Sequence, residues 1–116
     1  MADVVTLISD MLFSSKVREA AKATGVSVQS TRDVPALVSA ARAAKLVVID
    51  LRLPIALDAL DAVAADPEKG PATIVGFIDH EKTDVMDQAR AKGCAQVMAK
   101  GQFANALPKL LTSLRA

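Results

Sequence analysis

The sequence predicts an α/β fold, a doubly wound sheet of five parallel strands with five helices, arranged in three layers. Short apolar runs rich in β-branched residues alternate five times with longer amphipathic stretches rich in alanine, which is the pattern of βα units. The 116 residues suit one domain, which we expect to span residues 1–116. Right-handed crossovers between parallel strands place helices on both faces of the sheet.

The first strand is expected over residues 4–8, which do not alternate between polar and apolar side chains and so predict burial on both faces. A helix is expected next, from near Ser14 or slightly earlier to Thr24, with Gly25 as its C-cap. Residues 26–29 alternate between apolar and polar side chains, so this second strand is expected nearer an edge of the sheet.

The second helix has two candidate N-caps, Thr31 and Asp33, and Pro35 stands in its first turn, where a missing N–H costs nothing. Residues 46–49 are the most continuous apolar run and end abruptly at Asp50. This pattern predicts the central strand of the sheet.

The rest of the chain continues the alternation, with turn-forming residues between the elements. The expected elements are a helix over residues 54–67, a surface loop over 66–71, a strand over 73–78, a helix from about 79–83 to Gly93, a strand over 95–99, and a last helix that contains Pro108.

Composition excludes several classes of function. Lys and Arg number 14 and Asp and Glu 13, and Trp and Tyr are absent, so the basic and aromatic surface of a nucleic-acid-binding protein is missing. The single Cys94 and single His80 cannot build a disulfide or a structural zinc site. No run approaches the ~20 apolar residues of a membrane span, and Asp3 does not fit a signal peptide. We therefore expect a cytoplasmic protein with neither nucleic-acid nor membrane partners.

Charged or titratable residues follow four of the predicted strands, namely Asp10, Asp50, the pair Asp79-His80, and Lys100. The carboxyl ends of parallel strands meet at one edge of the sheet, where ligands gather near the topological switch point. Two clustered carboxylates favour a hard divalent cation such as Mg²⁺, and a lysine beside them can pair with a phosphoryl oxygen. An aspartate oxygen in such a site can attack phosphorus to give an acyl phosphate.

Two segments resemble the response-regulator receiver domains, the CheY-like family. Residues 46–54, which read Leu-Val-Val-Ile-Asp-Leu-Arg-Leu-Pro, resemble the phosphoacceptor strand and its following loop. Residues 91–100 resemble the run from an Ala-Gly turn through the last strand to the family's lysine, and the resemblance covers essentially the whole chain. It implies a CheY-like, flavodoxin-like fold. The site residues that it implies are Asp50 as phosphoacceptor, Lys100 as phosphoryl contact, and Asp10, Asp50 and the backbone carbonyl of Arg52 as magnesium ligands.

The end of the first strand departs from the family pattern. Receivers usually have paired acids there, whereas this chain has Ser9 followed by Asp10. An ungapped count places Ser9 at the more important acidic position, and a shift of one residue would make Asp10 a ligand. Asp10 also has a simpler alternative role as the cap of the first helix, whose N-terminus favours negative charge.

The positions around the fourth and fifth strands depart as well. The family's switch hydroxyl corresponds to Ile78 or, with a shift of one, to Asp79, and its aromatic switch residue corresponds to Val97. Gly101 follows the lysine in place of the usual proline, so we do not expect the characteristic cis peptide. Asp79 and His80 read either as a pH-sensitive pair or as an ordinary hydrogen-bonded loop. Cys94 is expected to be buried and inert.

Two function hypotheses remain. The first is a signal-transduction domain that acts through protein–protein contacts and is gated by Mg²⁺-dependent phosphorylation of Asp50; the alternative is a pseudo-receiver that binds a partner constitutively. Neither is an enzyme beyond accepting a phosphoryl group, and no glycine-rich turn or Gly-x-Ser-x-Gly motif supports another activity.

The partner would be a histidine kinase or a downstream effector, and the chain a monomer or weak dimer. It would be a single-domain receiver or a segment of a longer protein.

Receivers commonly bind partners through the surface of the fourth helix, fifth strand and fifth helix. Here the residues of that surface would be Met86, Arg90, Val97, Met98, Gln102 and Phe103. Core packing is the competing interpretation for the two methionines and Phe103.

Overall fold

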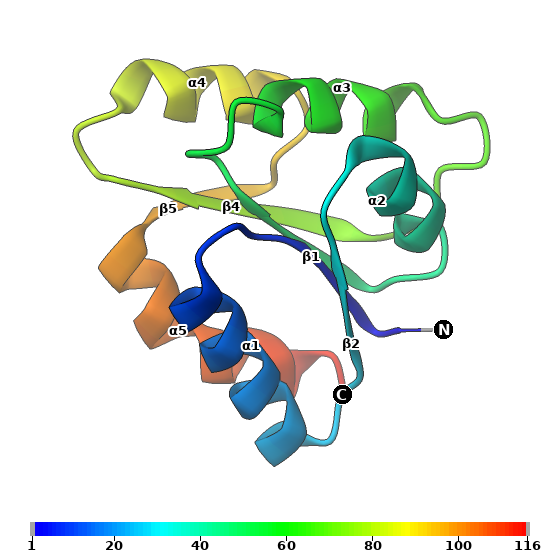
Figure 1. The fold of residues 1–116 in the computed structure, drawn as a ribbon, viewed down its shortest axis with the longest axis vertical. Helices are drawn as coiled ribbons and strands as arrows, with labels where there is room; N and C mark the ends of the chain where they lie inside the picture. Colours follow the sequence, from blue (N-terminus) through cyan, green and yellow to red (C-terminus); the bar gives the residue numbers. More distant parts are fainter. Residues whose placement is uncertain (1, 116) are drawn as a thin grey trace.

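The computed structural model describes residues 2–115, in which strands and helices alternate along the whole chain (Figure 1). The strands are β1 (Val4–Leu7), β2 (Val28–Thr31), β3 (Leu46–Asp50), β4 (Thr73–Ile78) and β5 (Gln96–Ala99). The helices are α1 (Met11–Thr24), α2 (Val34–Ala41), α3 (Ala56–Ala65), α4 (Thr83–Ala91) and α5 (Lys100–Ser113). The predicted five-stranded α/β fold is confirmed.

The sheet is parallel throughout, with the strand order β2-β1-β3-β4-β5. The chain runs from β2 past β1 to β3, so the strand order reverses between β1 and β3. Leu7 pairs with Ile49 at this point, and Asp50 pairs with Phe77 of β4 one residue further on. The topological switch point, where α/β folds bind ligands, therefore lies beside Asp50.

The sheet is covered on both faces, with α1 and α5 on one side and α2, α3 and α4 on the other (Figure 1). Side chains of β3 alternate between the two cores. Leu46 and Val48 pack with the first group, whereas Val47 and Ile49 pack with the second. Burial on both faces explains why this strand is apolar without interruption.

Helix α1 begins at Met11, earlier than the predicted start near Ser14. Its N-cap is Asp10, whose Oδ1 accepts hydrogen bonds from the backbone N–H groups of Leu12 at 2.9 Å and Phe13 at 3.2 Å. The helix ends at Gly25, which has a φ of 81° and so adopts the left-handed conformation that favours glycine. The predicted capping roles of Asp10 and Gly25 are both seen.

Strand β2 begins two residues later than predicted, because Val28 pairs with Val4 and the ladder continues to Thr31. The Thr31 hydroxyl donates to the Thr6 carbonyl at 2.7 Å, so it secures the strand and does not cap α2. That cap is Asp33, whose Oδ1 accepts from the Ala36 N–H at 2.8 Å.

Two proline positions differ in their effect on the helices. Pro54 lies in the turn that precedes α3, so this helix begins at Ala56 and not at the proline. Pro108 lies inside α5, which continues through it to Ser113. The hydroxyl of Thr112 donates to the Pro108 carbonyl at 2.8 Å, one turn further on.

The three phenylalanines form one stack beneath the carboxyl edge of the sheet. Phe77 of β4 lies between Phe13 of α1 and Phe103 of α5, with ring centroids 4.9 Å apart on each side. Aromatic stacking joins these elements at the end of the sheet where Asp50 lies. Among residues 2–115, no helix is long and apolar enough to cross a membrane.

Candidate functional site

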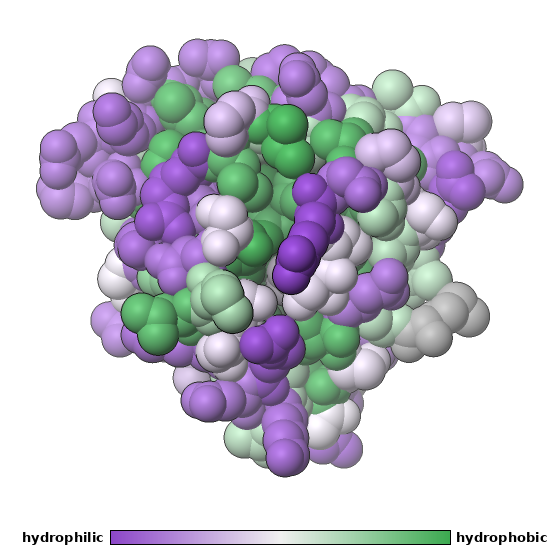
Figure 2. All heavy atoms as spheres, viewed as in Figure 1, coloured by the Kyte–Doolittle hydropathy of each residue, from purple (hydrophilic) through white to green (hydrophobic). Residues whose placement is uncertain are grey.

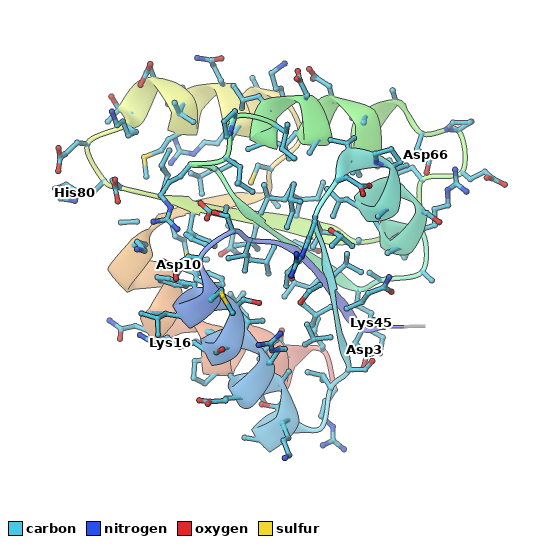
Figure 3. All side chains as sticks on the ribbon, in the orientation of Figure 1. Asp3, Asp10, Lys16, Lys45, Asp66 and His80 are labelled. Carbon is cyan, nitrogen blue, oxygen red and sulfur yellow. The ribbon has the colours of Figure 1, made fainter. Side chains whose placement is uncertain are left out.

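Four charged side chains meet at the carboxyl edge of β1, β3 and β5. Asp50 ends β3, and its side chain is 0% exposed. Asp10 caps α1, where Figure 3 labels it, and Lys100 is the first residue of α5. Arg52 lies in the loop after β3, with 30% of its side chain exposed.

Asp50 and Arg52 form a bidentate ion pair. The guanidinium donates from Nε to Oδ1 and from Nη2 to Oδ2, both at 2.9 Å. The backbone N–H of Arg52 also donates to Oδ1 at 3.1 Å, and the Ser9 hydroxyl lies 3.5 Å from Oδ2. Each oxygen of the buried carboxylate therefore has a donor, and this matters because an unpaired buried charge is strongly unfavourable.

The same guanidinium also links Asp50 to Asp10. Nη2 of Arg52 lies 3.5 Å from Asp10 Oδ2 and 2.9 Å from Asp50 Oδ2, so one cationic nitrogen lies between two carboxylates. The hydrogen bonds to Asp50 are the main reason that the pKa of Arg52 is raised, with a smaller contribution from Asp10. The guanidinium thus supplies positive charge where two acids approach each other.

Asp10 is the second acid of this group and faces two cations. Its Oδ2 lies 3.6 Å from Lys100 Nζ as well as 3.5 Å from Arg52. The pKa of Asp10 is lowered, first by the Phe13 backbone N–H, then by that of Leu12, and further by Lys100 and Arg52. Asp10 is therefore held ionised both by its capping role and by the site.

The two cations rest over the phenylalanine stack. Lys100 Nζ lies 4.9 Å from the centre of the Phe13 ring, and the guanidinium carbon of Arg52 lies 5.9 Å from that of Phe77. Cations at this distance are attracted to the negative face of an aromatic ring. The stack therefore helps to fix the positions of both cations.

The structure brings the three predicted residues Asp10, Asp50 and Lys100 to one edge, but the lysine pairs with Asp10. Within residues 2–115, no ion pair of 4.0 Å or less joins Lys100 to Asp50. The cation on Asp50 is Arg52, for which only the backbone carbonyl was expected to act. The side chain and N–H of Arg52 make its contacts with the site.

These residues do not fit Mg²⁺ in the arrangement that the structure shows. Mg²⁺ needs near-octahedral oxygen ligands at about 2.0–2.1 Å, whereas a guanidinium nitrogen lies between the two carboxylates. In residues 2–115, no group of three or more His, Cys, Asp or Glu side chains is arranged to hold a metal. In the structure, the Arg52 guanidinium bridges Asp10 and Asp50, the two carboxylates that were expected as metal ligands.

Among residues 2–115, the positions that correspond to the family's switch residues form no side-chain hydrogen bond or ion pair with Asp50. Ile78 and Val97 are buried in the core, and Asp79 lies exposed in the loop after β4. His80 is also exposed, with Nε2 4.0 Å from the Glu81 carboxylate, so it is not paired with Asp79. The simpler interpretation of a surface loop agrees with this geometry.

Most of the expected partner surface is core. Phe103 and Met98 are buried and Met86 is partly buried, so the competing interpretation was the better one for these three side chains, and Val97 is buried as well. Arg90 and Gln102 remain exposed. Sequence patterns did not identify the large apolar side chains that are exposed, Met11 at 81% and Leu12 at 78%, in the first turn of α1.

The role of the Arg52 side chain was also missed. The available signal was an arginine two residues after a strand-ending aspartate, a spacing at which the side chain can turn back onto the carboxylate.

Cys94 is buried as expected, and burial raises the pKa of its thiol to about 11.

The sequence matches no family model and no curated protein, whereas the fold matches many solved structures. A response regulator receiver domain from Rhodospirillum rubrum is 22% identical with a TM-score of 0.76, over 97% of this chain and 92% of that one. The chemotaxis response regulator CheY4 of Vibrio cholerae is 17% identical with a TM-score of 0.78, over 98% of both chains.

A third similar structure is the receiver domain of a sensor histidine kinase from Pseudomonas aeruginosa, which has a magnesium ion coordinated in its active site cleft. It is 14% identical with a TM-score of 0.78, over 99% of this chain and 98% of that one. At these identities the likeness concerns the fold. The chain therefore has the CheY-like, flavodoxin-like fold of receiver domains.

Proposed function

We propose that this chain is a receiver-like module of signal transduction that acts by binding a partner protein, with Arg52 holding Asp50 where a receiver would bind a metal. The observation that carries this proposal is the bidentate Asp50–Arg52 ion pair, together with the contact from Arg52 to Asp10. The receiver fold supplies the signalling context. Because Arg52 already pairs with both oxygens of Asp50, partner binding is expected not to depend on phosphorylation of Asp50.

Charge balance supports this assignment. Asp10 and Asp50 carry two negative charges, and Arg52 and Lys100 contribute two positive charges within 4 Å of them. A divalent cation would have to displace the guanidinium from a buried carboxylate and break two charge-assisted hydrogen bonds. The arginine is covalently tethered, so the metal competes against a cation of very high local concentration.

The partner in this proposal is a signalling protein of the cytoplasm, either a histidine kinase or a downstream effector, and the module binds it as a monomer or weak dimer. Met11 and Leu12 supply the contact surface. They are large, apolar and exposed, and they directly follow Asp10 in the chain. Exposed apolar side chains of this size favour burial against another protein.

Mg²⁺-dependent phosphorylation of Asp50 is the second candidate function. It is favoured by one observation, the convergence of Asp10, Asp50 and Lys100 at the edge of the sheet. It requires the partly exposed Arg52 side chain to leave Asp50. The two candidates therefore differ in what a phosphodonor does to the chain.

Intact-mass measurement after incubation with acetyl phosphate and Mg²⁺ separates these candidates. The wild type is expected to gain no phosphoryl group, as in Asp50→Asn. A phosphoryl gain in the wild type that is absent from Asp50→Asn would establish the second candidate.

Partner binding supplies the positive test. Wild type and Asp50→Asn used as affinity baits are expected to retain the same signalling protein with equal affinity, while Met11→Ser/Leu12→Ser loses it. Arg90→Gln/Gln102→Ala serves as the control, because those exposed residues belong to the other candidate surface, that of α4, β5 and α5. Retention by the Met11→Ser/Leu12→Ser bait at wild-type strength would contradict the proposed contact surface.

A further inference from the structure

A cavity of about 420 Å³ opens beside the ion-pair network, at the carboxyl ends of β1 and β2. It is bounded by the end of β1, the start of α1, the end of β2 and the loop after β3. Its volume falls within the range of small-molecule sites, and its position is next to the switch point between β1 and β3. Figure 2 shows hydrophobic atoms exposed near the centre of this face, with hydrophilic atoms on both sides.

Two arginines make the lining of this cavity positive. Arg18 comes from α1 and Arg32 follows β2, and no Asp or Glu lines the cavity. Among residues 2–115, neither guanidinium has a carboxylate within 4.0 Å; Arg18 has only a 3.4 Å contact with the Ser15 hydroxyl. Arg52 after β3 and Arg42 after α2 behave differently, since both are held by aspartates.

The remaining lining combines hydroxyl groups with apolar side chains. Ser14 and Ser30 can donate hydrogen bonds to an anion beside the arginines, while Ile8, Leu53 and Ile55 offer an apolar wall. Paired guanidinium groups bind phosphate with directed hydrogen bonds. Apolar side chains beside the arginines suit a ligand that carries an apolar body as well as a phosphate.

We infer that this cavity binds a small phosphate-bearing molecule with a flat apolar body, about the size of a nucleoside monophosphate. Arg18 and Arg32 hold the phosphate, and the aliphatic wall contacts the body. Ser9 lines the cavity and also lies 3.5 Å from Asp50 Oδ2, so the cavity adjoins the ion-pair network. The inference rests on the cavity and holds whether or not Asp50 is phosphorylated.

Titration of ¹⁵N-labelled protein with 5′-AMP in Mg²⁺-free buffer tests the inference. Adenosine, which lacks the phosphate, is the control ligand. AMP is expected to shift the amide resonances of residues around the cavity and to saturate at about millimolar concentration or below. Adenosine is expected to bind at least about tenfold more weakly, because it makes no charge-assisted bonds to the arginines.

The double variant Arg18→Gln/Arg32→Gln is expected to weaken AMP binding by about tenfold or more. Lys22→Gln/Lys109→Gln is the matched control, because it removes the same charge from exposed positions of α1 and α5 outside the cavity. Asp50→Asn is expected to bind AMP like the wild type, which separates this inference from the proposed function. Absence of saturable binding by the wild type, or equal weakening by the two double variants, would overturn it.

Discussion

The guanidinium of Arg52 donates to both carboxylate oxygens of Asp50 at 2.9 Å, although the two residues are only two positions apart in the chain. Asp50 ends a strand that is buried on both faces, so its carboxylate has no direct access to water. The ion pair with Arg52 therefore stabilises the buried negative charge of Asp50. Arg52 also reaches Asp10, which joins the ends of β1 and β3 through one side chain.

Arg52→Gln is expected to lower the free energy of unfolding by about 1–3 kcal/mol, because it leaves a buried carboxylate with only neutral donors. In an Asp50→Asn background the same substitution is expected to cost less than half as much. Urea unfolding of the wild type, Arg52→Gln, Asp50→Asn and the double variant measures this coupling. Arg42→Gln, which breaks the bidentate pair with Asp66, is the control and is expected to be independent of Asp50. Equal costs of Arg52→Gln in both backgrounds would show that the pair is not coupled.

Asp10 is expected to contribute stability that depends on pH. Its pKa is lowered in the folded state, so the contribution is fully present above the ordinary carboxyl value of 3.8 and is lost as pH falls through the lowered pKa. The difference in unfolding free energy between wild type and Asp10→Asn is therefore expected to shrink below that pH. Asp10→Ala is expected to be the less stable variant at neutral pH, because asparagine can still cap α1. A difference that does not change with pH would contradict this account.

Gly76 and Gly101 are expected to respond in opposite ways to alanine. A Cβ at Gly76 would lie 2.8 Å from Leu51 Cδ1 and 3.2 Å from Cys94 Sγ, so overpacking is expected to cost about 1–3 kcal/mol. At Gly101, in the first turn of α5, a Cβ meets no atom within 4 Å. Alanine there is expected to be neutral or to stabilise by up to about 1 kcal/mol. Thermal unfolding of both variants checks this, and equal effects would be inconsistent with the packing.

Cys94 is expected to be unreactive in the native protein. Its side chain is buried and burial raises the pKa of the thiol to about 11, so almost no thiolate is present near neutral pH. Labelling with a disulfide reagent at about pH 8 is expected to proceed only in denaturant. Rapid labelling of the folded protein would show that the thiol is accessible.

Local sequence patterns predicted the fold well where the turn signals were strong. Strand β4 was expected at Thr73–Ile78, as observed, because Pro71 precedes it and Asp79 follows it. The start of α1 was harder to predict. Met11 and Leu12 are apolar and exposed, so they do not follow the buried stripe of the helix.

The sequence pointed to three of the four charged residues at this edge of the sheet, but not to the pairing of the Arg52 side chain with Asp50. Strand order brings Asp10, Asp50 and Lys100 together, and the family resemblance named all three. The direction of the Arg52 side chain depends on the burial of Asp50 and on the distance to Asp10 across the sheet edge. Those relationships exist only in three dimensions, so the sequence pattern could not reveal that Arg52 holds Asp50.

The most direct test of the central claim, that Arg52 occupies the place of a metal at Asp50, is a Mg²⁺ titration of ¹⁵N-labelled protein. In the wild type, the amide resonances of Asp50, Arg52 and Asp10 are expected to show no saturable shift up to about 10 mM Mg²⁺, whereas Arg52→Gln is expected to bind Mg²⁺ with a Kd of about millimolar. Saturable shifts in the wild type, with an affinity equal to that of Arg52→Gln, would contradict the claim.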